Sequence, residues 1–421
     1  MNIFYTLGIH LYAFSVELSS LFHRKARMMR FGQWKTNGIL REHIDRSKEY
    51  IWFHAASLGE FEQGRPMIEK IKAQYPHYKI LLTFFSPSGY EVRKNYANAD
   101  VVCYLPFDTP YKVKKFINLA NPAIAIFIKY EFWGNYLGEL KKRHIPTYCI
   151  SGIFRQGQWF FKWYGRFYLG ALRCFDHLFV QDAHSADLLA RHGITNTTVA
   201  GDTRFDRVVD VQKQAPHIGI VESFVESNRQ NGQLFLIAGS SWPRDEEIVI
   251  NYFNGHPEIK LIIAPHEIER NRLLYIHSLL KRPSICLSEA SEQTIAQKDC
   301  LIIDSFGLLS SIYRYGDMAY LGGGFGKGIH NILEAAVYGM PVIFGPNCQK
   351  YKEAKDLIAC GGGFSVSGEE SFNSCMDNFV SYHNLLTSSG EAAGLFVRQS
   401  VGATAKILAA LQLDSYQGKK K

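Results

Sequence analysis

Residues 51–85 read IWFHAASLGEFEQGRPMIEKIKAQYPHYKILLTFF. The stretch opens with the apolar run Ile51–Ala55, continues through the amphipathic stretch Glu60–Gln74, and closes with a second apolar run, Ile80–Phe84. A strand, a helix and a strand in this order are typical of a βαβ unit, in which the two strands lie parallel. The stretch therefore predicts an α/β protein with a parallel sheet.

The same alternation continues along the chain, pauses, and then restarts. Residues 205–233 form the pause: they are polar, contain Pro216 and Gly219, and lack a clear strand. We therefore predict two Rossmann-like, doubly wound domains over 31–204 and 234–421, joined by a linker over 205–233, and allow the last helix to pack back on the first domain. Ligands are expected beyond the carboxyl ends of the strands, in a cleft between the domains. The further candidate strands are Val101–Leu105, Ala123–Ile128, Pro146–Ser151, His177–Val180, Leu234–Ala238, Lys260–Ala264, Cys300–Ile303, Met318–Leu321 and Pro341–Phe344.

Composition and charge narrow the class of protein. Of 421 residues, 47% are hydrophobic and 20% are charged, which excludes a disordered chain and a polytopic membrane protein. The formal net charge is +8, and the first 50 residues together with Lys419, Lys420 and Lys421 carry most of it. A nucleic-acid binder would place positive charge on a broad working face, so we expect no nucleic-acid partner. Charge at the two ends of the chain indicates attraction to a membrane surface instead.

The N-terminal segment, 1–30, is an apolar stretch with a basic flank. Residues 3–22 are mostly apolar and place several large side chains on one helical face, and Arg24–Arg30 follow. Glu17 would cost roughly 2.5–3.5 kcal/mol at the centre of a bilayer. Three interpretations stay open: a marginal membrane-spanning anchor, a helix lying in the interface with its basic flank on lipid phosphates, or a helix packed on the protein's own body.

The turn after the first strand, His54–Glu60, contains the first candidate for chemistry. Ser57 and Glu60 have the spacing of a capping box, and the sequence alone favours this structural role. The alternative is that Glu60 is a carboxylate at the mouth of the cleft, placed to accept a proton.

Four loops of the second half could receive a phosphate. Backbone N–H groups near a helix start are expected in Ala238–Ser241, Ala264–Glu267 and Asp304–Gly307, and the glycine-rich stretch Gly322–Gly328 should let backbone approach a ligand before the next helix. Glu334 lies one turn into that helix by this prediction. It either accepts hydrogen bonds from sugar hydroxyls or is an acid favoured by the helix dipole, whereas His330 is interpreted as a structural residue.

Several segments resemble, in order along most of the chain, the motifs of the 3-deoxy-D-manno-octulosonic acid (Kdo) transferases of lipid A biosynthesis. The matching segments are Phe53–Glu60 with the family's His-Ala-x-Ser-x-Gly-Glu, Thr83–Gly89 with its Pro-containing turn, Glu131–Asn135 with Glu-Leu-Trp-Pro-Asn, Gly201–Asp206 with Gly-Asn-x-Lys-Phe-Asp, and His330–Glu334 and Gly345-Pro346 with His-Asn-Pro-Leu-Glu and Gly-Pro. The resemblance implies the GT-B glycosyltransferase fold. It also implies inverting, metal-independent transfer of Kdo from CMP-Kdo to the lipid A precursor, lipid IVA, without a cofactor, at the cytoplasmic face of the cell inner membrane.

Carried over by position, the resemblance makes Glu60 the catalytic base and Glu131 a second important acid in the acceptor-binding domain. The CMP-Kdo contacts that it implies are Pro265, His266, Phe306, Gly307, Leu308, Asn331, Ile332, Leu333 and Glu334. There are departures from the family's pattern. His266 and Glu267 follow Pro265 where the family has Arg-His, so the cation facing the donor phosphate is either weaker or supplied by Arg270 or Lys327. Gly239-Ser240-Ser241-Trp242 stands for Gly-Ser-Thr-His, and Leu308 stands where an acid is usual.

Two other functions remain as alternatives. One is another GT-B enzyme with a UDP-sugar donor, such as a lipid-A-disaccharide synthase or a nucleotide-sugar epimerase, because the fold alone does not decide the donor. The other is a membrane-tethered nucleotide-binding module without activity, against which the intact motif around Glu60 argues. The aromatic and basic segment Trp159–Arg173 suits either a membrane interface or a buried aromatic helix.

Overall fold

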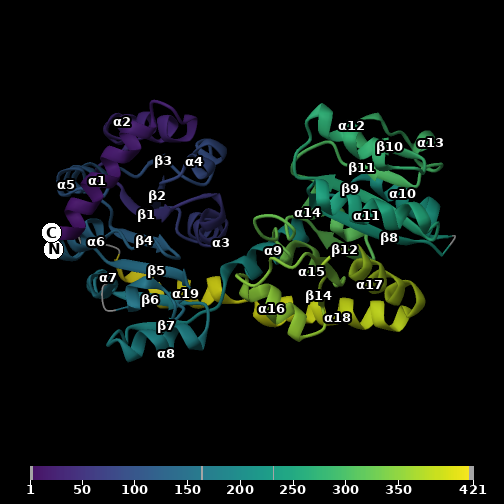
Figure 1. Ribbon diagram of the computed structural model, residues 1–421. Coiled ribbons are helices and arrows are strands. Elements are labelled where there is room, and N and C mark those ends of the chain that lie inside the picture. Colours follow the sequence, from purple (N-terminus) through teal and green to yellow (C-terminus); the bar gives the residue numbers. More distant parts are fainter. Residues whose placement is uncertain (1–2, 163–164, 231, 417–421) are drawn as a thin grey trace. The chain divides into compact units, whose positions relative to one another are not determined.

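The computed structural model describes residues 3–162, 165–230 and 232–416, and the chain folds as two compact α/β units (Figure 1). The described residues of Met1–Arg207 and Val401–Lys421 form the first unit, and those of Val208–Ser400 form the second. Trp163 and Tyr164 of the aromatic segment, and the basic tail Lys419–Lys421, lie outside the described residues.

The first unit is built on a parallel sheet of seven strands in the order β3-β2-β1-β4-β5-β6-β7, which runs through the unit from β3 to β7 in Figure 1. The strands expected here are all present, and the three-residue edge strand β7 is additional. The strands are β1 (Glu49–Ala55), β2 (Tyr78–Phe84), β3 (Val101–Tyr104), β4 (Ile124–Ile128), β5 (Thr147–Gly152), β6 (His177–Val180) and β7 (Thr197–Val199).

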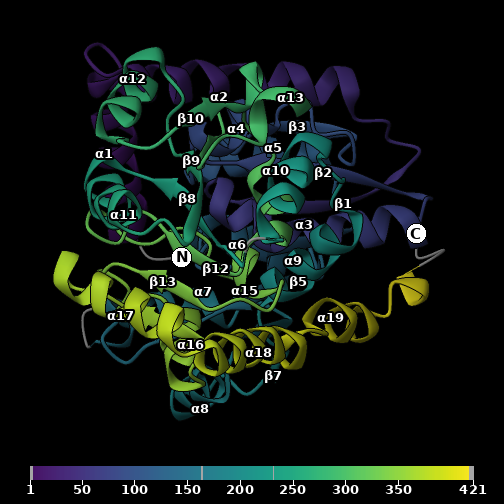
Figure 2. The same ribbon diagram turned by 90° about the vertical axis from the view of Figure 1, so that its right-hand side faces the viewer.

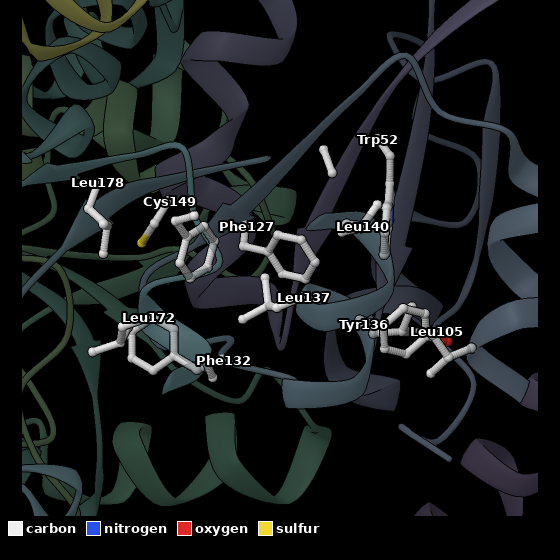
Figure 3. Close-up of a cluster of buried hydrophobic side chains, with 14 of the residues drawn as sticks. Trp52, Leu105, Phe127, Phe132, Tyr136, Leu137, Leu140, Cys149, Leu172 and Leu178 are labelled. Carbon is white, nitrogen blue, oxygen red and sulfur yellow. The ribbon is translucent and has the colours of Figure 1, made fainter. Parts of the chain in front are cut away.

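Helices cover both faces of this sheet, so its central strands are buried on both sides and are almost continuously apolar. Figure 3 shows the core on one face, where Trp52, Phe127, Tyr136 and Leu140 pack together. On the other face α3 and the C-terminal α19 supply apolar side chains to a second core. The helices of this unit are α1 (Ile3–Ser19), α2 (Arg24–His43), α3 (Leu58–Gln74), α4 (Pro87–Arg93), α5 (Pro110–Ala120), α6 (Gly134–Lys142), η1 (Trp159–Phe161), α7 (Arg166–Leu172), α8 (Ala183–Arg191), α19 (Ala403–Leu411) and η5 (Leu413–Tyr416).

The second unit repeats the architecture with a parallel sheet in the order β10-β11-β9-β8-β12-β13-β14. Figure 2 labels β9, β8 and β12 of this sheet. The expected strands are again present, and the short strands β10 and β14 are additional. Its strands are β8 (Leu234–Ser241), β9 (Ile259–Pro265), β10 (Ser284–Cys286), β11 (Cys300–Ile302), β12 (Met318–Leu321), β13 (Val342–Phe344) and β14 (Gly363–Ser365). Its helices are α10 (Gly219–Arg229), α11 (Pro243–Gly255), α12 (Arg270–Leu279), η3 (Leu287–Glu289), α13 (Glu292–Ile295), α14 (Leu309–Ile312), η4 (Tyr313–Tyr315), α15 (Leu333–Ala336), α16 (Lys352–Ala359), α17 (Glu369–Ser381) and α18 (His383–Ser400).

The stretch 205–233 is mostly helical. α9 (Thr203–Gln214) carries the chain from the first unit into the second, and α10 then packs on the second unit, where the hydroxyl of Tyr315 accepts the N–H of Ile218 at 2.9 Å. The carboxylate of Asp206 accepts the N–H groups of Gly402 and Thr404, which ties the start of α19 to the first unit.

The N-terminal helix α1 packs on the first unit by a narrow tyrosine stripe. The ring of Tyr12 stacks on Phe85 at 6.3 Å and meets Phe107 edge-on, and Tyr5 contacts Tyr168 edge-on. The rest of its apolar face is exposed, including Leu7, Leu11, Phe14 and Leu18. Within the described parts of the chain, no helix combines the length and the apolar character needed to cross a membrane.

Candidate functional site

The strand order reverses between β1 and β4 in the first sheet and between β8 and β12 at the centre of the second sheet. The loops that follow the two strands at such a switch point run in opposite directions. They leave a crevice beyond the carboxyl ends of these strands. The segments that follow these four strands contain most of the candidate residues.

After β1 the chain turns at Ser57 and enters α3 with Glu60 in its first turn. Ser57 is the N-cap residue, but its side chain makes no cap bond; its hydroxyl instead donates to Glu60 Oε2. The capping box favoured by the sequence is therefore wrong. The reason is the direction of the side chains: the Ser57 hydroxyl donates to the Glu60 carboxylate, and its oxygen does not accept a helix N–H, as a capping box requires.

After β4 the chain passes through Lys129, whose φ of +67° is a left-handed conformation, and reaches Tyr130 and Glu131. The side chain of Glu131 is only 13% exposed. Its Oε2 lies 3.1 Å from Nε2 of His54 and accepts the indole N–H of Trp133 at 2.7 Å. Two polar contacts to one oxygen hold this carboxylate in a fixed orientation.

His54 is in turn held by a buried chain of hydrogen bonds. Its Nδ1 lies 2.9 Å from Oγ1 of Thr83, which accepts the indole N–H of Trp52 at 2.8 Å. A neutral His54 that donates through Nε2 to Glu131 and accepts the Thr83 hydroxyl at Nδ1 satisfies every group of the chain. Sequence analysis did not assign this role to His54, although a histidine inside an apolar strand run was a signal for it.

Beside Glu131 lies a cavity of about 390 Å³, here called the aromatic pocket, which contains no candidate from the second unit. Burial raises the pKa of Tyr130, Arg155 and Gln158 lower it, and the carboxylates of Asp182 and Glu60 add smaller rises. Part of the segment Trp159–Arg173 lines the pocket: Phe160 is buried and Trp159 is 46% exposed. The pocket is lined by Tyr5, Tyr130, Glu131, Phe132, Trp133, Gln158, Trp159, Phe160 and Tyr168.

A buried carboxylate, Asp108, braces one wall of the aromatic pocket. It accepts the hydroxyl of Tyr5 at 2.5 Å and the backbone N–H groups of Asn135 and Tyr136 at 3.0 and 2.8 Å. Burial raises the pKa of Asp108 to about 7, although these three hydrogen bonds lower it. Asp108 thus links α1 to the start of α6.

In the second unit the glycine-rich stretch after β12 packs tightly on its own neighbours. A Cβ on Gly322 would lie 2.2 Å from the carbonyl oxygen of Ser240, and one on Gly324 would lie 2.5 Å from the backbone N of Gly345. These glycines therefore allow three loops to approach one another closely. This packing explains the glycines without a ligand.

Asp245 joins two of these loops at their base. Its Oδ2 accepts the N–H groups of Trp242 and Gly323, both at 2.9 Å, and its Oδ1 accepts the hydroxyl of Tyr320 at 2.7 Å. The exits of β8 and β12 are thereby held in one arrangement. Ser240 precedes this point with a φ of +51°, and Ser241 is buried with its hydroxyl on Glu246.

Three rings cover the exits of β8, β9 and β12. His266 stacks on Trp242 and on His330, with 4.6 Å between ring centroids in both cases. The Trp242 indole N–H donates to Nε2 of His330 at 3.2 Å, and burial and the nearby His266 lower the pKa of His330. His266 follows the buried Pro265 and is exposed, so it is the ring of the three that is open to a ligand.

Of the cations near these loops, Arg270 and Lys327 are exposed, whereas Arg272 is engaged. Arg272 lies 2.6 Å from Oε2 of the buried Glu246. Burial raises the pKa of Glu246, and Arg272 and Ser241 oppose that rise. The ion pair of Arg272, a residue of α12, was not predicted from the sequence.

The other expected donor contacts follow β11 and β12. Phe306 is 75% exposed, Gly307 has a φ of +86°, and Leu308 is the N-cap residue of α14. The amide of Asn331 donates to Glu334 Oε1 at 2.9 Å, beside the buried Ile332 and Leu333. The prediction that Glu334 lies one turn into the helix is wrong, because α15 begins at Leu333 and Glu334 is its second residue.

The structure thus brings Ser240, Ser241, Pro265, His266 and the Asn331–Glu334 segment to one edge of the second sheet, because β9, β8 and β12 are neighbours. The Phe306–Leu308 segment follows β11, which pairs with β9. Within the residues that the structure describes, no three His, Cys, Asp or Glu side chains gather as metal ligands.

Comparison with known proteins shows which family this chain is similar to. The family model described as 3-deoxy-D-manno-octulosonic-acid transferase matches residues 26–207. The chain is 26% identical over 336 residues to the 3-deoxy-D-manno-octulosonic acid transferase of Aquifex aeolicus, covering 78% of this chain and 85% of that protein. It is also 26% identical over 355 residues to that of Haemophilus influenzae, covering 81% of this chain and 80% of that protein.

The fold has relatives among solved structures. UDP-GlcNAc 2-epimerase from Neisseria meningitidis, solved with UDP-GlcNAc, superposes with a TM-score of 0.58 at 13% identity, covering 87% of this chain and all of that one. At this identity the likeness concerns the fold, the GT-B arrangement of two Rossmann-like domains. Together, the family match over residues 26–207 and these relatives show that this chain is similar to the Kdo transferases over most of its length.

Proposed function

We propose that this protein transfers Kdo from CMP-Kdo to the lipid A precursor lipid IVA, with inversion at the anomeric carbon. The observation that carries the proposal concerns two acids: Glu131 lines the aromatic pocket, and Glu60 lies in the first turn of α3. They follow β4 and β1, the two strands at the switch point of the first sheet. An acceptor hydroxyl is a weak nucleophile near pH 7, and a positioned carboxylate contributes about 10²–10⁴-fold by accepting its proton.

In this proposal Glu60 is the base. Its carboxylate is partly exposed and accepts the hydroxyl of Ser57 through Oε2, and among the residues that the structure describes its second oxygen has no hydrogen-bond partner. Glu131 is better suited to hold the acceptor, because His54 and Trp133 fix its Oε2 and its side chain is mostly buried. In a single displacement the acceptor oxygen bonds to the anomeric carbon as the bond to the CMP phosphate breaks, and the proton goes to Glu60.

We propose the loops of the second unit as the CMP-Kdo site. Backbone N–H groups and His266 at the strand ends are suited to a phosphate, and Asn331 with Glu334 is suited to ribose hydroxyls. Because Arg272 is already paired with Glu246, Arg270 and Lys327 remain the candidates for the cation that faces the leaving phosphate.

We propose that the protein works at the cytoplasmic side of the cell inner membrane. The exposed apolar face of α1 is followed by basic residues of α2, the combination expected of a helix that lies in a lipid interface. Because Tyr5 of the same helix lines the aromatic pocket, docking of α1 on lipid would bring the pocket close to a membrane-bound acceptor.

The test is product analysis. The full chain is incubated with CMP-Kdo and lipid IVA, and the lipids are weighed by mass spectrometry. The expected result is lipid heavier by one or more Kdo residues, with release of CMP. Unchanged lipid, together with turnover of a UDP-sugar in a parallel reaction, would overturn the proposal in favour of another GT-B enzyme. Binding of CMP without any product would favour the inactive nucleotide-binding module.

A further inference from the structure

A second cavity of about 260 Å³ lies in the first unit between α2 and α5 and shares no lining residue with the aromatic pocket. We call it the lysine pocket. Nothing in the proposed transfer reaction uses it. It is lined by Gln33, Trp34, Asn37, Pro106, Tyr111, Lys112 and Lys115.

A buried amide at this pocket has an unused donor. Gln33 is 7% exposed, and its Oε1 accepts the backbone N–H of Phe107 at 3.3 Å, which fixes which way the amide faces. Its Nε2 is buried and, within the described residues, has no hydrogen-bond partner. A buried donor without a partner costs about 1–3 kcal/mol, so a ligand that offers an acceptor would recover this loss.

Two lysines give the pocket positive charge, and among the described residues neither is paired with a carboxylate. Lys112 Nζ lies 5.2 Å from the ring centroid of Phe107, and Lys115 Nζ lies 5.9 Å from that of Tyr111. Burial lowers the pKa of Lys112, and the field of Glu17 in α1 opposes this shift. Both ammonium groups therefore remain available to an anion.

The rim of the pocket is aromatic and open to solvent. Trp34 is 62% exposed and Tyr111 is 75% exposed, and the guanidinium of Arg30 lies 5.0 Å from the ring of Trp34. Large aromatic side chains and arginines in such exposed positions are typical of the headgroup layer of a membrane. α1, with its exposed apolar side chains, packs directly on α2.

We propose that the lysine pocket binds the phosphate of an anionic glycerophospholipid, held by the Gln33 amide, Lys112 and Lys115, with Trp34 and Tyr111 lying among the neighbouring headgroups. The volume suits a phosphoglycerol headgroup and is small for a disaccharide, so the occupant is a lipid of the surrounding membrane and not the glycolipid substrate. The inference does not rest on the transfer reaction, because it concerns a separate pocket.

The experiment is calorimetric titration of the full chain with dihexanoyl phosphatidylglycerol, kept below its critical micelle concentration. Saturable binding is expected. Gln33→Glu should weaken it at least about tenfold, because the carboxylate keeps the bond to Phe107 N–H but replaces the donor by a repelling oxygen. The double variant Lys112→Gln, Lys115→Gln should weaken it similarly, and Lys112→Arg, Lys115→Arg should retain it.

The matched control is Lys114→Gln, which removes an exposed charge from the same helix outside the pocket. This variant should bind like the wild type; equal weakening by Lys114→Gln would overturn the proposal, because it would indicate only general charge attraction. Binding of glycerol 3-phosphate or inorganic phosphate as tight as that of the lipid would overturn the lipid assignment in favour of a small-anion site. Absence of saturable binding would overturn the site itself.

Discussion

The ring of His54 and the carboxylate of Glu131 lie 3.1 Å apart, Nε2 to Oε2, although 77 residues separate them in the chain. β1 and β4 pair in register across this point, with His54 opposite Phe127, so the sheet itself brings the two side chains together. Because His54 is fully buried and bonded to Thr83, it can hold Glu131 without contacting a ligand. His54 is therefore a positioning residue.

The variants His54→Asn and His54→Gln test this role. An Asn amide can replace Nδ1 toward Thr83 but does not reach Glu131, whereas a Gln amide can replace Nε2. We expect His54→Asn to lower kcat by about 10²-fold, the usual effect of a small misplacement, and His54→Gln to recover much of it. Steady-state kinetics with CMP-Kdo and lipid IVA measures both. Equal rates in the two variants would contradict the positioning role of His54. The affinity for CMP is the control and should be the same in both variants as in the wild type.

The buried carboxyl of Asp108 predicts a pH dependence of stability. Its pKa is about 7 in the folded protein and about 4 in an unfolded chain. Between these values the folded protein keeps a proton that the unfolded chain releases, so this contribution to stability is present at low pH and is lost as pH rises through about 7. Asp108→Asn abolishes it.

Urea unfolding of the wild type and Asp108→Asn at several pH values measures this effect. As the pH rises from about 4 to about 7, the wild type should lose stability relative to Asp108→Asn. The loss in its free energy of unfolding should be on the order of a few kcal/mol. A difference that stays constant over this range would mean that Asp108 is ionised throughout.

The exposed face of α1 predicts membrane attachment. Leu11→Gln, Phe14→Gln and Leu18→Gln change side chains that are 60%, 65% and 55% exposed, so the fold should be unaffected. Together they should move much of the protein from the membrane pellet to the supernatant, because each apolar side chain contributes about 1.5–3 kcal/mol when fully buried in lipid. An unchanged distribution after cell fractionation would contradict an interfacial role for this face. Circular dichroism checks the fold.

The pair Asn331 and Glu334 predicts a contribution to donor binding. If Glu334 bonds a ribose hydroxyl, Glu334→Ala should weaken CMP binding by roughly 1–3 kcal/mol in calorimetry. Glu226→Ala, which removes an exposed acid from α10 of the same unit, is the control and should bind CMP as the wild type does. Unchanged affinity of Glu334→Ala would leave Glu334 as a residue of the short helix α15 without a part in binding.

Much of the fold could be predicted from the sequence because buried parallel strands are nearly continuous apolar runs, as Ile51–Ala55 and Lys260–Ala264 are. The strands β7, β10 and β14 were missed, since each has three residues and lies at or near a sheet edge, where three side chains make no recognisable period. The strand order, and with it the two switch points, follows from long-range pairing and not from local pattern.

The candidate site was predictable only in part for the same reason. Glu60 and Asn331–Glu334 stand in recognisable local patterns, so they were found. The His54–Glu131 pair depends on strand register: the histidine inside an apolar run was a signal for His54, but not for its partner. The Arg272–Glu246 pair depends on helix packing and has no local signal. Ser57 shows the limit of pattern reasoning: its spacing to Glu60 is that of a capping box, yet its hydroxyl bonds the carboxylate itself.

The most direct test of the account is the rate of Kdo transfer by Glu60→Gln. A Gln amide keeps an oxygen for the Ser57 hydroxyl, so the thermal midpoint should stay within a few degrees and the affinity for CMP should be unchanged. The amide cannot accept the acceptor's proton, so kcat should fall by about 10²-fold or more with little change in KM. Glu42→Gln, at an exposed position of α2, should keep full activity. If Glu60→Gln transfers Kdo at nearly the wild-type rate, Glu60 is not the base and the proposed mechanism is contradicted.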